Sequence, residues 1–150
     1  MNKDTQLLLD IEAIHQLKAR YFRGMDTKDW AMLADCFTEE LVADFREGPG
    51  MLAEGRDNYM SQLTDILADA VTVHHGHMPE IEILDPANAT GIWAMEDLVF
   101  LPGISIQGWG HYHERYRKEG DTWRIAEVRL TRLRLLQNGG EVDLSGGGFG

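Results

Sequence analysis

The sequence predicts an α+β domain in which a curved, cone-shaped sheet, antiparallel or mixed, wraps around three N-terminal helices. Three stretches before residue 70 show the three- and four-residue apolar spacing of helices, and from about residue 71 the chain changes to long runs rich in β-branched and aromatic residues. Helices followed by a run of strands indicate an α+β architecture. A curled sheet that is closed at one end by helices leaves a hollow that can hold a small ligand.

Three helices are expected before residue 70. Residues 5–25 predict the first, because apolar side chains recur there at Ile11, Ile14, Leu17 and Tyr21. The stretch "MDTKDW" indicates a helix end and a restart, where Asp26 or Thr27 can cap a second, short helix. Residues 56–69 predict the third helix, whose inner face would carry Tyr59, Leu63, Ile66 and Leu67.

The remaining elements are strands. "LVADFRE" alternates apolar and polar residues as a strand does, and "GPG" at 48–50 marks a turn. Turn signals at 85–88, 102–103 and 119–121 divide the second half into an antiparallel meander of four long strands. We therefore expect one domain over residues 1–136, followed by a flexible glycine-rich tail over residues 137–150.

Charge and composition exclude several kinds of partner. With 14 basic and 25 acidic residues the formal charge is −11, and there is no long Lys/Arg run, which argues against nucleic acid and anionic membranes. No apolar stretch approaches the ~20 residues that cross a bilayer, and the N-terminus lacks the pattern of a signal peptide. The single cysteine, Cys36, lies in an apolar helical pattern that indicates a buried structural thiol and fits a reducing compartment. A cytoplasmic protein is expected.

Histidines are the most informative residues. "VTVHHGHMPEIEI" contains His74, His75 and His77, and "GHYHERY" contains His111 and His113. Neighbours on a strand face opposite sides, so His74 cannot share a face with His75. Two H-x-H pairs could form a metal site with Glu80 or Glu82, or they could lie at a subunit interface or on the surface. We expect no metal.

His74 gains interest from Asp26 in "GMDTKDW". An imidazole is an effective general base only when its tautomer and orientation are fixed, and a buried carboxylate bonded to the far nitrogen fixes both. Asp26 could provide that carboxylate or could simply cap a helix. The spacing of the two residues cannot decide between these roles, because only the fold can bring them together.

Three ordered segments resemble the SnoaL-like branch of the nuclear-transport-factor-2-like superfamily over about residues 8–136. They are "IEAIHQLKARYFRGMDTKDWAMLADCFTEELVADF", "VHHGHMPEIEILDPANATGIWAMEDLVF" and "GHYHERYRKEGDTWRIAEVRLTRL". The texture is most similar to scytalone dehydratases and bile-acid dehydratases, and less so to a hexachlorocyclohexane dehydrochlorinase. The resemblance implies an α+β barrel that needs no metal or organic cofactor, in a homo-oligomer that is a trimer by analogy or else a dimer.

The resemblance also implies catalytic residues. The family's aspartate falls on Asp26, its histidine on His74, the tyrosine five residues before the aspartate on Tyr21, and the arginine of the last strand on Arg132. The implied reaction is that of a dehydratase. His74 takes the proton next to a carbonyl, Asp26 orients the imidazole, and Tyr21 and Arg132 stabilise the enolate. The protonated His74 then returns the proton to the departing hydroxyl in a syn elimination of water.

The expected substrate is small, cyclic and largely apolar. The expected substrate-binding residues are Phe22, Met25, Trp30, Phe45, Tyr59, Trp93, Trp109 and His111. Oligomerisation is expected because the outer face of the sheet would remain apolar, with Leu130, Leu133 and Leu135 as candidates. Two alternatives stay open: a non-catalytic ligand-binding or assembly protein of the same fold, and an isomerase, cyclase or dehydrohalogenase that uses the same dyad.

Overall fold

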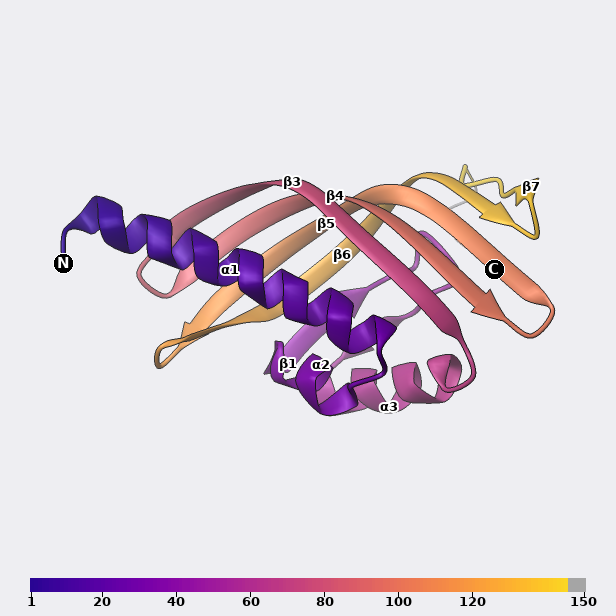
Figure 1. The fold of residues 1–150 in the computed structure, drawn as a ribbon, viewed down its shortest axis with the longest axis horizontal. Helices are drawn as coiled ribbons and strands as arrows, with labels where there is room; N and C mark the ends of the chain where they lie inside the picture. The colour runs from indigo at the N-terminus through magenta and orange to yellow at the C-terminus, as the bar shows by residue number, and fades with distance from the viewer. Residues whose placement is uncertain (146–150) are drawn as a thin grey trace.

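A computed structural model of the chain describes residues 1–145, which form three helices and one seven-stranded sheet (Figure 1). The helices are α1 (Lys3–Asp26), α2 (Trp30–Asp35) and α3 (Arg56–Leu67). The strands are β1 (Phe37–Asp44), β2 (Leu52–Glu54), β3 (Val71–Asp85), β4 (Asn88–Leu101), β5 (Ile104–Glu119), β6 (Thr122–Gln137) and β7 (Gly140–Glu141). Helix α1 crosses the long strands on one side of the sheet, and α2 and α3 lie beyond its C-terminal end.

The strand order is β2-β1-β6-β5-β4-β3, with β7 paired to β6. Only β1 and β6 run parallel, so the sheet is mixed, and the predicted antiparallel meander is β3 to β6. The predicted α+β class, the three helices and the meander are confirmed. The sheet is curved but does not close into a barrel, because β2 and β3 remain its two edges.

Two short strands, β2 and β7, were not predicted. Strand β7 turns the chain back onto β6, where Leu136 pairs with Glu141 and the N–H of Val142 donates to the carbonyl of Leu135. The first part of the expected tail, residues 137–150, is therefore attached to the sheet. Residues 146–150 of that expectation lie outside the described residues.

Helix α1 is anchored at its N-terminal part. The Asn2 side chain caps it by accepting from the backbone N–H groups of Asp4 and Thr5. Further along, the buried carboxylate of Asp10 accepts from Trp123 Nε1 and from Lys118 Nζ, both at 3.0 Å, at the hairpin between β5 and β6. These bonds fix one end of a 24-residue helix that is about 36 Å long at 1.5 Å per residue.

The predicted cap of the second helix is wrong. Asp29 caps α2 by accepting from the N–H of Met32, at 3.1 Å. Asp26 is instead the last residue of α1, and Thr27 is its C-cap residue. The side chain of Asp26 is therefore not needed to start α2.

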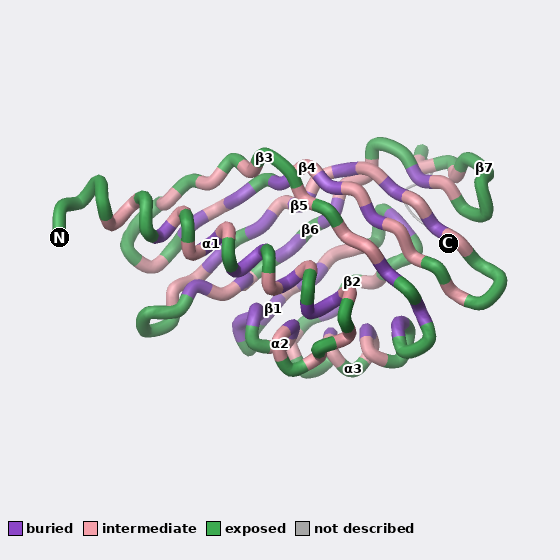
Figure 2. Tube along the Cα trace, viewed as in Figure 1, coloured by how far each residue is buried: buried purple, intermediate pink, exposed green. Residues whose placement is uncertain are grey.

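Buried positions alternate with mostly half-buried ones along β4 and β5 (Figure 2). Odd-numbered residues of β4 and even-numbered residues of β5 face the helices and form the core with the inner faces of α1, α2 and α3. Cys36 is buried in this core, and burial raises the pKa of its thiol to about 11. No helix in residues 1–145 is long and apolar enough to cross a membrane.

Two of the leucines expected on the outer face are not there. Leu130 and Leu135 are buried inside the sheet, and only Leu133 is exposed, at 73%. Leu130 faces inward because it pairs with the inward Tyr112. An irregularity in the pairing of β5 with β6, between Trp109 and Gly110, then inserts one extra residue into β6, so that Leu135 also faces inward while Leu133 stays outside.

Candidate active site

Asp26 and His74 form a hydrogen-bonded pair. The imidazole Nδ1 lies 2.6 Å from Asp26 Oδ1, and the backbone N–H of His74 donates to Asp26 Oδ2 at 2.8 Å. Thr72 adds a third bond, from its hydroxyl to Oδ1 at 2.9 Å. Strand β3 is an edge of the sheet, so a backbone N–H that faces away from β4 is available to the end of α1. The fold thus joins two residues that sequence spacing could not pair.

The pair fixes the tautomer of His74. Partial burial acts to raise the pKa of Asp26, but the hydrogen bonds from His74 and Thr72 outweigh it, so the pKa lies below its ordinary value. An ionised carboxylate can only accept, and therefore Nδ1 carries the proton and Nε2 is left with a free lone pair. The ring is held from one side by Phe22, whose plane lies within 17° of the imidazole plane.

His74 borders a partly open cavity of about 260 Å³ between α1, α3 and the inner face of the sheet. The apolar side chains that line it are Met25, Phe45, Pro49, Met51, Leu63, Ile66, Leu67, Val99, Leu101, Ile104, Ile106 and Leu130. The polar ones are Tyr21, Tyr59, His74, Asp97, Tyr112, Arg132 and Gln137. Such a lining suits a largely apolar molecule that carries a few oxygen atoms.

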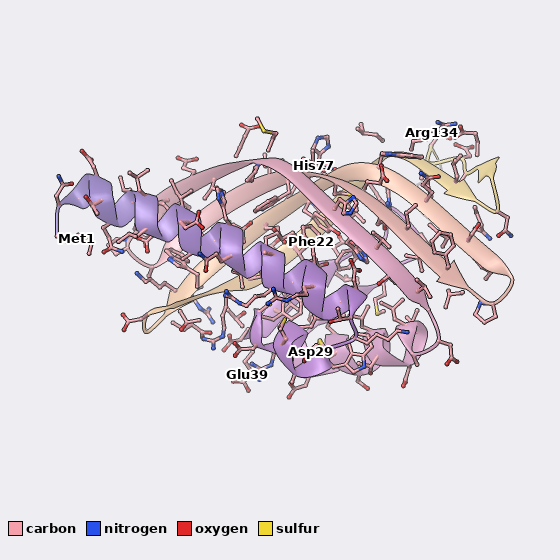
Figure 3. All side chains as sticks on the ribbon, in the orientation of Figure 1. Met1, Phe22, Asp29, Glu39, His77 and Arg134 are labelled. Atoms are coloured by element: carbon pink, nitrogen blue, oxygen red, sulfur yellow. The ribbon has the colours of Figure 1, made fainter. Side chains whose placement is uncertain are left out.

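The structure brings together some of the expected substrate-binding residues. Met25, Phe45 and Tyr59 line the cavity, as do Tyr21, His74 and Arg132 of the expected catalytic set, with Asp26 behind His74. Phe22 is not part of the lining, because it lies between α1 and the sheet, against His74 (Figure 3). Trp30 packs against the core from α2.

The other three expected residues point elsewhere. Trp93 faces inward but lies away from the cavity, where its Nε1 donates to the Tyr116 hydroxyl at 2.9 Å. Trp109 and His111 are odd-numbered residues of β5 and so project from the outer face of the sheet, where Trp109 Nε1 donates to Glu96. Strand alternation therefore removes these two from the cavity.

Three tyrosine side chains, Tyr21, Tyr59 and Tyr112, supply hydroxyls to the cavity. Burial raises the pKa of each phenol well above 10, and for Tyr21 the neighbouring Tyr112 and Tyr59 add to the effect. All three stay protonated at neutral pH and can donate hydrogen bonds. Tyr112 reaches the cavity because it lies at an even-numbered position of β5, whose side chains face the helices.

Arg132 is held by Asp97. The Nη1 and Nη2 atoms of the guanidinium donate to the two carboxylate oxygens at 2.5 and 2.9 Å, and the side chains are only 4% and 8% exposed. Asp97 lies opposite His74 in the register of β3 with β4, and opposite Gly108 in the register of β4 with β5. A Cβ at Gly108 would overlap the ion pair, so a larger residue at this position would displace it.

A second ion pair lies deeper. Lys18 Nζ and Glu114 Oε2 are 2.9 Å apart with neither side chain exposed, and the Tyr116 hydroxyl donates to the other oxygen of Glu114 at 2.8 Å. The ammonium lies 3.8 and 3.6 Å from the ring centroids of Tyr21 and Tyr112. The pair therefore supports two tyrosines of the cavity from behind. The pair was not predicted from the sequence, because a lysine on an amphipathic helix is normally exposed.

The other histidines do not converge. His75 and His77 lie on the outer side of β3, where Figure 3 shows His77 pointing away from α1, and His111 lies on the same face with Ala94 between it and His77. Within residues 1–145 no group of three or more histidine, cysteine or acidic side chains is arranged to hold a metal ion. The metal alternative gains no donor set from this geometry.

Comparisons with known proteins agree with this architecture. A family model described as SnoaL-like domain matches residues 6–129. A curated relative, "Probable cyclase FGR4" of Gibberella zeae, is 26% identical over 133 residues, covering 80% of this chain and 89% of its own.

Two solved structures share the fold. One is named "Putative Scytalone Dehydratase", from Novosphingobium aromaticivorans, with 20% identity, coverage of 89% of this chain and 90% of its own, and a TM-score of 0.79. The other is a type 2 hexachlorocyclohexane dehydrochlorinase (LinA), with 18% identity, coverage of 90% and 93%, and a TM-score of 0.79. The fold is therefore one that serves small-molecule-converting enzymes.

Proposed function

Because the chain belongs to the SnoaL-like domain family, we propose that it is a cofactor-independent lyase that removes water from a small, largely apolar cyclic substrate. The observation that carries the proposal is the Asp26–His74 pair at the wall of an apolar cavity. A cavity filled by core side chains would have favoured a scaffold instead. The open volume beside a tautomer-fixed imidazole favours chemistry on a bound molecule.

The proposed reaction uses His74 twice. Its Nε2 takes the proton from the carbon next to a carbonyl, and the electron pair of that C–H bond moves into an enolate. The enolate then expels the β-hydroxyl, which leaves as water with the proton that Nε2 returns to it. The charge of Asp26 stabilises the intermediate imidazolium. A base in this position typically contributes about 10² to 10⁴ in rate.

The enolate oxygen needs a hydrogen-bond donor that is already in place. We assign this role first to Tyr21, whose phenol stays protonated and lines the cavity. Arg132 is the second donor, although both of its Nη atoms already serve Asp97. The low polarity of the lining strengthens each of these bonds.

The second candidate function is a different reaction that uses the same Asp26–His74 pair. The curated relative is named a cyclase, and one solved neighbour is named a dehydrochlorinase. Each such reaction can start with a base that removes an acidic C–H proton. Cyclisation, isomerisation and loss of halide differ from dehydration in the leaving group and in where the proton returns.

Solvent deuterium exchange tests the first step without knowledge of the leaving group. The protein is incubated in D₂O with 1-tetralone, a neutral bicyclic ketone, and mass spectrometry follows exchange of the α-protons. Dehydration is followed with 3-hydroxy-1-tetralone, which yields fluorescent 1-naphthol. His74→Ala is expected to lower the exchange rate by at least about 100-fold with the fold intact.

The matched control is His75→Ala, which removes an exposed imidazole on the opposite side of the same strand and should leave exchange unchanged. If His74→Ala exchanges as fast as the unmodified protein, the dyad assignment is wrong. If exchange depends on His74 but no naphthol forms, a cyclase or isomerase on the same dyad is favoured over a dehydratase.

A further inference from the structure

We propose that the cavity selects uncharged ligands, and that Asp97 sets this selection by cancelling the charge of Arg132. The inference rests on the proposed function only in taking this cavity as the substrate site. Arg132 is the one arginine or lysine among the residues that line the cavity in the described part of the chain. Its pairing therefore decides whether the wall attracts an anion.

Asp97 occupies the position that a ligand carboxylate would take. A guanidinium binds carboxylates and phosphates through two parallel N–H bonds, and free arginines in binding sites recognise anions in this way. Here both bonds, at 2.5 and 2.9 Å, go to Asp97, and both side chains are more than nine-tenths buried. The edge of Arg132 formed by Nη1 and Nη2 is therefore already filled by the protein itself, and Nε, which has no hydrogen-bond partner, is buried close to Gly48.

Two glycines leave room for the Asp97–Arg132 pair. Gly108, the cross-strand neighbour of Asp97, must lack a side chain for the pair to fit, because a Cβ there would overlap both Arg132 and Asp97. Gly48 packs against the guanidinium from the loop before β2, where a Cβ would lie 3.1 Å from Arg132 Nε. The pair is thus packed closely against two glycines, at which a larger residue would displace it.

The other charges near the cavity give no compensating cation. Lys18 is paired with Glu114 at 2.9 Å, and Asp26 faces an imidazole that is neutral when it is ready to act as a base. Lys18 and Arg132 carry two positive charges, and Glu114, Asp26 and Asp97 carry three negative charges. An anionic ligand that left water for this cavity would therefore meet no unpaired positive charge, and the loss of its hydration would not be repaid.

Neutral oxygen atoms are treated differently. The three tyrosine hydroxyls stay protonated and can donate to a carbonyl or hydroxyl without any change of charge. The rest of the lining is apolar. The ligand class that fits is a neutral ring system with ketone or hydroxyl oxygens, and the class that is refused is the same ring system bearing a carboxylate.

Calorimetric binding of two probes of similar size tests the inference: 1-tetralone, which is neutral, and 2-naphthoate, which is an anion. The unmodified protein is expected to bind 1-tetralone at least about tenfold more tightly. Asp97→Asn frees the guanidinium and is expected to bind 2-naphthoate about tenfold or more better than the unmodified protein does. Asp97→Asn/Arg132→Gln, which has neither charge, should lose that gain.

Tighter or equal binding of 2-naphthoate by the unmodified protein would overturn the inference, and this comparison needs no variant to fold. Unchanged 2-naphthoate binding in folded Asp97→Asn would overturn the role of Asp97. Neither readout requires turnover. A protein that selects neutral ligands but exchanges no protons would refute the lyase and leave the charge selection standing.

Discussion

Asp26→Asn tests the dyad most sharply, because the carboxylate receives three donors and has no donor of its own. Thr72 Oγ and His74 Nδ1 both reach Oδ1, and the backbone N–H of His74 reaches Oδ2. Asparagine has a single accepting oxygen, so its NH₂ group must replace one of the two. If the NH₂ group faces the backbone N–H of His74, two hydrogen-bond donors oppose each other. If the NH₂ group faces the imidazole, the ring proton must move to Nε2, which is the atom that must act as base.

The size of the effect follows from these bonds. Either placement forfeits at least one hydrogen bond to a charged acceptor, worth about 1.5 to 3 kcal/mol. Since about 1.4 kcal/mol corresponds to a factor of ten in rate, the variant should lose roughly one to two powers of ten. His74→Ala should lose more, because it removes the base and not only its orientation.

The assay is α-proton exchange into 1-tetralone, combined with ¹⁵N NMR of the imidazole, which reports the tautomer without any substrate. Asp29→Ala is the matched control, since it removes the carboxylate that caps α2. It should cost about 1 kcal/mol of stability and leave exchange unchanged. Wild-type exchange together with a proton still on Nδ1 in Asp26→Asn would refute the orienting role of the carboxylate.

Three further outcomes are expected. Thr72→Val removes one donor and should raise the pKa of Asp26 toward its ordinary value, as ¹³C NMR titration of the carboxyl would show, whereas Thr72→Ser should not. Folding lowers the pKa of Asp26, so the stabilisation that this carboxylate contributes is present above the unfolded pKa of about 3.9 and is lost as pH falls through the folded pKa. Urea unfolding at a series of acidic pH values should show this loss of stability. The Asp26→Asn variant should not show it. Lys18→Met leaves Glu114 buried without its cation and should cost about 3 to 5 kcal/mol in urea unfolding, with partial recovery in Lys18→Met/Glu114→Gln.

The fold was predictable because its elements carry clear periodicities. The apolar spacing over residues 5–25 and the alternation after residue 71 gave the helices and the meander within a few residues. The short strands β2 and β7 were not predicted, because two or three residues cannot show the two-residue alternation of a strand. The pairing of His74 with Asp26 came from the family resemblance, since residues so far apart in sequence carry no local signal of contact.

The residues that line the cavity were harder to predict, because aromatic composition does not show to which face of a strand a side chain points. Trp109 and His111 looked suitable as lining and yet face outward, while Asp97 faces inward opposite His74. The position of each residue in the strand alternation decides this, and β5 carries aromatic residues at both odd and even positions, so composition alone does not show which set faces inward. A fully buried Lys18 is likewise invisible to any rule that places charge at the surface.

Two acidic residues of α1, Asp10 and Asp26, give the helix a strict length. Asp10 holds the hairpin between β5 and β6, and Asp26 holds the edge strand β3. Adding or deleting one residue between them would turn one carboxylate by about 100° relative to the other and shift it by about 1.5 Å. Insertions should therefore be tolerated before Asp10 and in the exposed hairpin turns, but not in the stretch between these two acids, where a single extra residue would swing the carboxylate away from its histidine.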